Sequence, residues 1–306
     1  MPAAAAAASG LIGTNRSAWL HLTGTHVSSQ AGRLYKFSSA LEAIPPSELA
    51  SFDPDFVRAM NSQASPIYAP SVSTILAATV VNDGLKFWRQ KVGEEEADRV
   101  SSTASARGTV MHAAIEQFLT QSGADGEARD LVASAEAAGN ELLLSMASVI
   151  NSIAKKDSRC KIKKKKKHFA VLAPNTNLSH RSWLVESAVY SAQHNFAGTC
   201  DWVGELDGVP TLCDWKSSRA PKNTRASLGT YPLQIAAYWA AVREMYGERA
   251  AHLKRAAVVV GYSSGKAATV HKFEEDELLM LYEQFKLLRK LFAYRYNDDG
   301  SAKEET

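Results

Sequence analysis

The 306-residue chain has few cysteines, no long apolar run and, over its first 41 residues, no acidic residue. Its three cysteines, Cys160, Cys200 and Cys213, are too few for a disulfide framework or a four-thiolate metal site. We therefore expect thiols that fill the core, a reducing compartment and no iron–sulfur cluster. Charged residues interrupt every hydrophobic stretch before about eighteen residues, which argues against a membrane-spanning helix.

The acid-free segment between Met1 and Leu41 is rich in Ala, Ser and Thr and carries scattered basic residues. That composition is typical of an organelle transit peptide, and plain disorder is the alternative. Prolines then punctuate the sequence, so we interpret residues 1–65 as a transit peptide and flexible linker. The folded domain is expected over 66–296, followed by a disordered tail at 297–306.

The net charge of +3 is too small to identify a partner, but the charge is unevenly distributed. Between Lys155 and His168 nine lysines and arginines accompany one acid, Asp157, and so dense a run cannot pack into a core. We interpret residues 155–181 as a basic insertion, either solvated or in contact with nucleic-acid phosphates. The run also resembles a nuclear import signal, which leaves a nuclear location as the alternative to an organelle.

Hydrophobic periodicity predicts an α/β order in which helices cover one sheet, with a helical region at the start of the domain. The predicted helices are 71–85, 106–120, 127–153, 228–246 and 276–296, and the predicted strands are 183–191, 196–206, 209–216, 256–262 and 268–273.

The hairpin around Asp207-Gly208 carries the strongest local argument. If these two residues form the turn, Leu206 faces Val209, and counting outward places Asp201 opposite Asp214. Two ionised carboxylates about 5 Å apart repel by about 3 kcal/mol at an effective dielectric constant of 20. The pair therefore calls for a divalent cation or a shared proton.

Lys216 follows Asp214 by two residues, so the strand's period places its ammonium on the same face, while Trp215 points into the packing. Glu186 on the preceding strand joins this face if its connection is tight. Such an oxygen-rich cluster suits Mg²⁺ or Mn²⁺ better than zinc. The alternative is an ordinary solvated strand edge, and Pro210 opposes the register if it forces a bulge.

Four segments in this order resemble the RecB-like branch of the PD-(D/E)xK nuclease superfamily, in particular the mitochondrial genome maintenance exonucleases. They are Val185-Glu186-Ser187-Ala188-Val189, Gly198-Thr199-Cys200-Asp201, Leu212-Cys213-Asp214-Trp215-Lys216-Ser217-Ser218 and Pro232-Leu233-Gln234-Ile235-Ala236-Ala237-Tyr238. Two upstream blocks, 70–76 and 108–112, are also similar to that family. The resemblance implies a restriction-endonuclease-like fold, a central mixed sheet flanked by helices.

The resemblance also assigns roles to individual residues. It implies that His112, Asp201, Asp214 and the Trp215 carbonyl hold the metal, that Lys216 is catalytic and that Glu186 supports the site. Gln234 and Tyr238 share one helical face as the family's Q-x-x-x-Y motif, which implies that they orient the nucleic-acid backbone beside the metal.

Basic and aromatic residues near the proposed site predict contacts with the substrate. Arg219, Lys222 and Arg225 lie in the loop between the strand that carries Lys216 and the following helix, where phosphates have to pass, and Ser217 precedes them. The alternative is an ordinary solvated loop. Trp88 and its neighbour Phe87 lie among basic residues and are expected either to stack on single-stranded nucleic acid or to pack in the core.

The sequence thus predicts a monomeric, metal-dependent exodeoxyribonuclease that digests single-stranded DNA from free ends. Its expected setting is mitochondrial DNA maintenance, replication or repair, with proteins of those processes as partners. The alternatives are a structure-specific endonuclease, an RNA nuclease and a catalytically inactive nucleic-acid-binding module.

Overall fold

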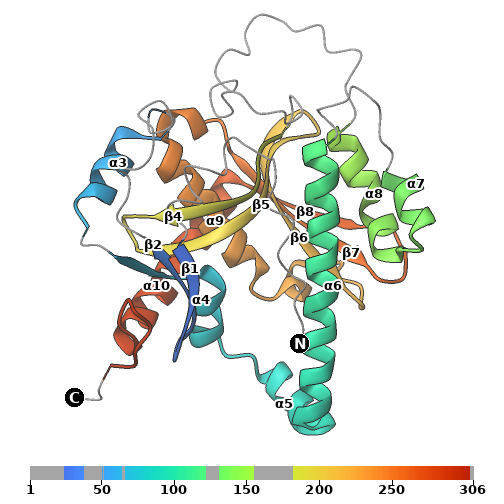
Figure 1. The fold of residues 1–306 in the computed structure, drawn as a ribbon, viewed down its shortest axis with the longest axis horizontal. Helices are drawn as coiled ribbons and strands as arrows, with labels where there is room; N and C mark the ends of the chain where they lie inside the picture. Colours follow the sequence, from blue (N-terminus) through green and yellow to red (C-terminus); the bar gives the residue numbers. More distant parts are fainter. Residues whose placement is uncertain are drawn as a thin grey trace, which may run out of the picture.

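The computed structural model describes residues 24–37, 50, 52–63, 66–121, 131–154 and 182–303. A five-stranded sheet in the order β4-β5-β6-β7-β8 lies at its centre, with helices on both faces (Figure 1). Only the β6–β7 pair is parallel, so the sheet is mixed and the expected α/β class is confirmed. The strands are β4 Ser182–Ser191, β5 Phe196–Leu206, β6 Val209–Ser218, β7 Arg255–Tyr262 and β8 Thr269–Glu274.

The β5–β6 hairpin has the predicted register. Leu206 pairs with Val209, and the ladder continues to Trp202 opposite Cys213. Asp207 and Gly208 both have positive φ, 54° and 74°, as a two-residue turn between twisted strands requires. Pro210 pairs with Glu205 without a bulge. In an antiparallel ladder this is a non-hydrogen-bonded pair, so the backbone nitrogen of Pro210 points away from β5 and its missing N–H costs no ladder bond.

The two faces of the sheet are covered by separate hydrophobic clusters. The larger one joins the sheet to α3 Pro54–Asn61, α4 Val72–Thr79, α9 Tyr231–Tyr246 and α10 Glu275–Arg295. The smaller one joins the other face to α6 Glu94–Gln121, α7 Leu131–Ala137 and α8 Glu141–Ala154. Every residue of β7 is buried, as expected of a strand covered on both faces. Short 3-10 helices, η3 Arg225–Leu228 and η4 Gly247–Ala250, flank α9.

The segment before residue 66 is more ordered than the sequence predicts. Strands β1 Gly24–Ser29, β2 Gly32–Phe37 and β3 Ile67–Pro70 form a three-stranded antiparallel sheet. Phe37 of β2 is fully buried and its ring lies 5.0 Å from that of Tyr190. The prediction of a flexible linker is therefore wrong for 24–37 and 52–61, because short strands and one helix separated by turn residues give little periodicity. The expected transit peptide lies mainly in residues 1–23, outside the described residues.

Two further boundaries differ from the predictions. The helix predicted over 71–85 is interrupted, since α4 ends at Thr79, the next residue Val80 is extended, and Asn82 caps a separate helix, α5 Asp83–Val92. The tail predicted to be disordered is folded over 297–303, where Lys303 N–H donates to Arg295 O and Gly300 packs beside Ser29. The expected basic insertion at 155–181 lies outside the described residues.

The remaining structural expectations concern cysteines and membranes. Cys200 and Cys213 are free and buried, as predicted, while Cys160 is outside the described residues. Within the part of the chain that the structure describes, no helix is both long and apolar enough to cross a bilayer.

Candidate active site

Two buried carboxylates lie where the β5–β6 ladder ends. Asp201 is 6% exposed and Asp214 is 1% exposed. Beyond the Trp202–Cys213 pair, Asp201 Oδ2 accepts a hydrogen bond of 2.6 Å from Trp215 N–H. The Asp201 side chain thus takes the place of a ladder bond, which fixes it beside Asp214.

The surroundings of the pair disfavour two negative charges. Burial and the neighbouring Asp214 raise the pKa of Asp201 well above its usual value, against the opposing effect of His112 and Lys216. Asp214 Oδ2 is buried and accepts no hydrogen bond of good geometry. It lies 2.7 Å from Lys216 Nζ as an ion pair. A bound cation would offset the repulsion between the two carboxylates and give the buried Asp214 Oδ2 a partner.

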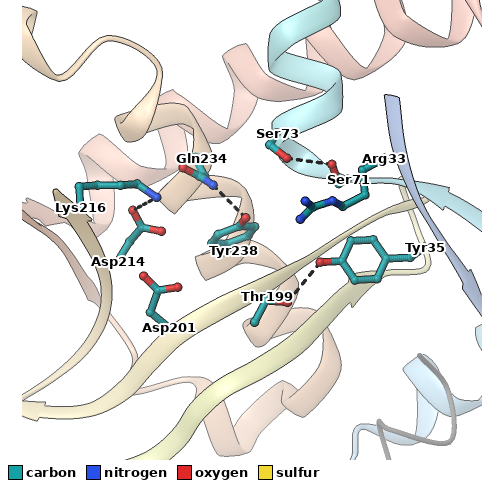
Figure 2. Close-up of a pocket in the computed structure, with 10 residues that line it drawn as sticks. All are labelled: Arg33, Tyr35, Ser71, Ser73, Thr199, Asp201, Asp214, Lys216, Gln234 and Tyr238. Carbon is teal, nitrogen blue, oxygen red and sulfur yellow. Dashed lines mark hydrogen bonds and ion pairs between the residues drawn. The ribbon is translucent and has the colours of Figure 1, made fainter. Parts of the chain in front are cut away.

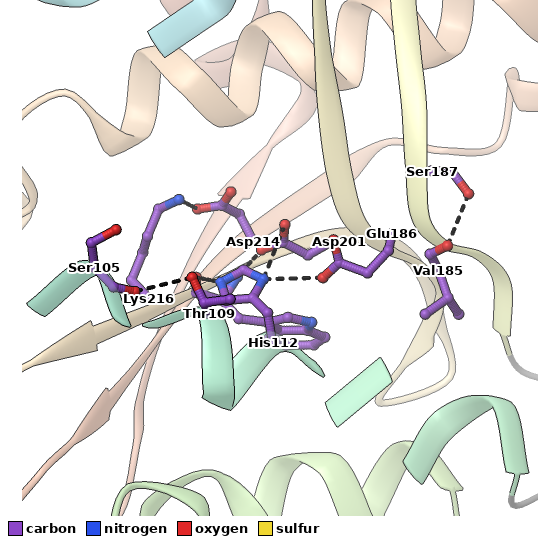
Figure 3. A network of polar contacts seen from close by, with 10 residues as sticks. Ser105, Thr109, His112, Val185, Glu186, Ser187, Asp201, Asp214 and Lys216 are labelled. Carbon is purple, nitrogen blue, oxygen red and sulfur yellow. Dashed lines mark hydrogen bonds and ion pairs between the residues drawn. The ribbon is translucent and has the colours of Figure 1, made fainter. Parts of the chain in front are cut away.

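His112 of α6 bridges the acids of the sheet (Figure 3). Its Nδ1 lies 3.0 Å from Glu186 Oε1 and 3.6 Å from Asp201 Oδ1, and its Nε2 lies 3.0 Å from Trp215 O. Burial opposes the imidazolium, but these carboxylates outweigh it and raise the pKa of His112 to about 9. His112, which only the resemblance to the nuclease family singled out, thus points from its helix toward Glu186 and Asp201.

Glu186 has an unusual backbone. Its φ is +43° in the middle of β4, between the ladder pairs Val185–Trp202 and Ser187–Cys200. A residue other than glycine in this region costs about 1 to 3 kcal/mol, and such strain concentrates at functional sites. Here the strained residue is the one whose carboxylate meets His112.

The structure contains a group of side chains that fits a divalent cation. One ligand atom from each of His112, Glu186 and Asp201 lies within 4.8 Å of the others. Two carboxylates and one imidazole, with Asp214 alongside, form a hard, mostly oxygen donor set. The Trp215 carbonyl, also predicted as a ligand, lies 3.0 Å from His112 Nε2 and therefore beside this group.

Lys216 is held by an acid and a ring. Its Nζ lies 2.7 Å from Asp214 Oδ2 and 5.1 Å from the centre of the Tyr231 ring. Burial opposes its charge, but Asp214 and Asp201 raise the pKa of Lys216 above its usual value. Lys216 is therefore a cation beside the acidic pair.

A pocket opens onto Asp201, Asp214 and Lys216 (Figure 2). Gln234 Nε2 donates to the Tyr238 hydroxyl over 2.9 Å, so the predicted pair on α9 lines the pocket as one unit. Tyr238 packs directly on Gly198 of β5, where an added Cβ would lie 2.3 Å from its ring. Glycine at 198 is what allows α9 to bring this pair to the acids. The lining residues are Arg33, Tyr35, Ser71, Ser73, Thr199, Asp201, Asp214, Lys216, Gln234 and Tyr238.

Half of the pocket lining was not predicted as site residues. Ser71 and Ser73 belong to an upstream block similar to the nuclease family, which was the available signal for them. Thr199 lies inside one of the matched motifs. Arg33 and Tyr35 lie in the segment interpreted as presequence and linker, and no sequence signal marked Arg33.

The predicted nucleic-acid contacts are outside this pocket. Lys222 Nζ donates to Ser227 O, within its own loop. Arg225 is paired with Glu277 and stacked on Phe273 at 3.7 Å, so its guanidinium already has partners. Arg219 is exposed.

The other two predicted contacts lie on β6 and α5. Ser217 lies beside Gly108 of α6. Trp88 is half-buried on α5, a helix with no buried residue, and its neighbour Phe87 is 68% exposed. The core-packing alternative is therefore wrong for Phe87.

Comparison with known proteins gives one family and a set of relatives. The sequence profile described as "PD-(D/E)XK nuclease superfamily" matches residues 82–300, more than half of the chain. The chain is also similar to proteins named mitochondrial genome maintenance exonuclease 1. The Xenopus tropicalis protein is 30% identical over 121 residues, which are 40% of this chain and 34% of that protein. The Homo sapiens protein is 34% identical over 105 residues, 34% of this chain and 30% of that protein.

The Mus musculus protein is 33% identical over 105 residues, again 34% of this chain and 30% of the relative. The chain thus spans about a third of the length of the curated relatives it matches. The resemblance recognised from the motifs is confirmed.

Proposed function

The chain belongs to the PD-(D/E)XK nuclease superfamily, and from that premise we propose that it is an exodeoxyribonuclease that hydrolyses single-stranded DNA from free ends with Mg²⁺ or Mn²⁺. The observation that carries the proposal is the buried pair Asp201 and Asp214 with Lys216 in one pocket. A site built only to bind DNA gains nothing from carboxylates that face phosphates.

Asp201, Glu186 and His112 would hold the cation, with Asp214 completing the set. Bound there, a divalent ion polarises a phosphodiester and lowers the pKa of a water molecule. Mg²⁺ and Mn²⁺ are the proposed ions because carboxylate oxygens dominate the donors.

The remaining groups position the substrate. The Lys216 ammonium, fixed between Asp214 and the Tyr231 ring, donates hydrogen bonds toward the charge that develops on the phosphate. The linked side chains of Gln234 and Tyr238 line the same pocket and orient the sugar–phosphate backbone. Both act from a rigid helix packed on the sheet, which keeps the reacting atoms aligned.

The wider setting is also proposed. Similarity to the mitochondrial exonucleases supports a mitochondrial location and a role in mitochondrial genome maintenance. We propose replication or repair of that genome as the process and a monomer as the working form. The basic side chains of α5, the half-buried Trp88 and the exposed Phe87 are proposed to contact the strand outside the pocket.

The test uses the full chain with end-labelled linear and circular single-stranded DNA, in Mg²⁺, in Mn²⁺ and in a chelator. We expect loss of the linear substrate alone, and only with metal. Asp214→Ala and Lys216→Ala should each reduce hydrolysis at least 100-fold while DNA binding is retained. Full activity in both variants would overturn the assignment, cleavage of the circle would indicate an endonuclease, and binding without cleavage would indicate a binding module.

A further inference from the structure

The pocket has two chemically different ends (Figure 2). Asp201, Asp214 and Lys216 lie at one end, where hydrolysis is proposed. Arg33 and Ser73 lie at the other end, beyond the glutamine and tyrosine of α9. The second end comes from β2 and the start of α4, elements with no part in the proposed cation site.

Arg33 is a fixed residue with a free guanidinium. Its carbonyl accepts hydrogen bonds from Ser71 N–H at 3.2 Å and from Thr74 Oγ1 at 2.7 Å, so its backbone is tied to the start of α4. Its side chain forms no hydrogen bond and no ion pair with the residues that the structure describes, although two carboxylates line the same pocket. The guanidinium is thus available to an anion from outside the chain.

Hydroxyl groups stand beside this guanidinium. Thr74 donates to the Arg33 carbonyl and Ser71 donates to Thr74, so the contact of 2.9 Å between Ser71 Oγ and Ser73 Oγ uses the Ser73 proton. Ser73 is exposed in the first turn of α4, and its hydroxyl can rotate from Ser71 to another acceptor. The positive end of the helix favours an anion at the same place.

The charge of the site favours a phosphate beside the scissile one. Arg33 and Lys216 balance the two acids of the lining, and a divalent cation held by these acids and Glu186 would leave the whole site with a charge of about +1. Tyr35 and Thr199 hydroxyls, 3.2 Å apart, connect β2 to β5. Thr199 and Asp201 lie two residues apart on β5, so the end of the pocket at Thr199 is about 6.8 Å along the strand from Asp201.

We propose that Arg33, with Ser73, binds the phosphate next to the one that is hydrolysed. This second subsite rests on the proposed nuclease function and adds a residue that holds the strand across the catalytic acids. The β1–β2 hairpin thereby contributes to substrate recognition as well as to the fold.

The experiment measures binding of short single-stranded DNA to Asp214→Asn protein in a chelator, by fluorescence anisotropy across a range of salt. Adding Arg33→Ala should weaken binding about tenfold, the loss expected of a charge-assisted contact. It should also reduce the slope of log affinity against log salt by about 0.7, one phosphate contact on a single strand. Arg33→Lys should recover part of the affinity. The matched control is Lys36→Ala on the same strand, whose ammonium lies over the Tyr68 ring and not in the pocket; it should leave both quantities unchanged.

Oligonucleotides with one uncharged methylphosphonate linkage locate the contact. One position of this linkage should weaken binding to the protein that retains Arg33 and have no effect on the Arg33→Ala variant. Comparing the binding of an oligonucleotide with and without a terminal phosphate shows whether Arg33 contacts a terminal phosphate or an internal one. Equal binding with and without the Arg33→Ala substitution, at every linkage, would overturn the subsite while leaving nuclease activity of the wild-type protein unaffected. Absence of that activity would instead overturn the proposed function.

Discussion

At the scale of single residues, the close carboxylates of Asp201 and Asp214 lower the stability of the folded chain when no cation is bound between them. Asp201→Asn keeps an oxygen to accept the Trp215 N–H bond but removes one negative charge. We expect the variant to be more stable than wild type in a chelator, by about 1 kcal/mol, because repulsion between close carboxylates is relieved.

The same variant should lose hydrolysis at least 100-fold and lose most of the rise in melting temperature that Mg²⁺ gives the wild-type protein, since binding to the folded state is what stabilises it. Thermal unfolding with and without metal measures both effects. A variant clearly less stable than wild type in the chelator would show that the pair is not under charge strain.

The acidic pair was predictable because strand alternation and a two-residue turn place Asp201 opposite Asp214 by counting alone. Glu186 was assigned to the same face on the basis of a regular strand, whereas its carboxylate is aimed by a φ of +43° that no pattern reveals. Arg33 could not be found, because its relation to the pocket depends on how β2 packs beside β5. Long-range packing of this kind leaves no trace in local sequence.

At the scale of elements, the contact between β5 and α9 depends on one missing methyl group. Gly198→Ala would place a carbon atom 2.3 Å from the Tyr238 ring, so the ring, and α9 with it, has to shift. We expect a loss of about 1 to 3 kcal/mol in the free energy of unfolding, typical of overpacking, and at least a tenfold loss of hydrolysis because Gln234 moves with Tyr238.

Gly84→Ala on α5 is the matched control. The nearest atom to its added carbon is 3.7 Å away, an ordinary contact, and alanine suits a helix better. Stability should be unchanged or slightly raised. Chemical denaturation measures the stability of the Gly198→Ala and Gly84→Ala variants, and single-turnover kinetics measure their rates of hydrolysis. Equal behaviour of the two variants would refute the role given to Gly198.

At the scale of the whole molecule, the first two strands belong to the folded unit. β2 pairs with β3, and Phe37, Phe56 and Met60 are buried in the larger hydrophobic cluster. A chain that begins at residue 66 would expose that surface and leave β3 as an unpaired edge.

We therefore expect the chain 66–306 to be aggregation-prone and to melt at least 10 °C below the chain 24–306, since several buried side chains are lost together. Differential scanning calorimetry and size-exclusion chromatography check this, with the full chain as reference. Equal melting temperatures would show that the N-terminal sheet is dispensable. The boundary at 66 was predicted because the residues before it show little periodicity and are punctuated by prolines, and short strands joined by turns give the same pattern as a linker.

The long separation between His112 and Trp215, whose atoms meet at 3.0 Å, has a consequence during protein synthesis. A growing polypeptide carries His112 well before the acids emerge, and the Gln234–Tyr238 pair follows later still. Until α9 has left the ribosome, the chain has no complete hydrolytic centre. A copy that is cut short before α9 would therefore lack the part of the pocket that Gln234 and Tyr238 line.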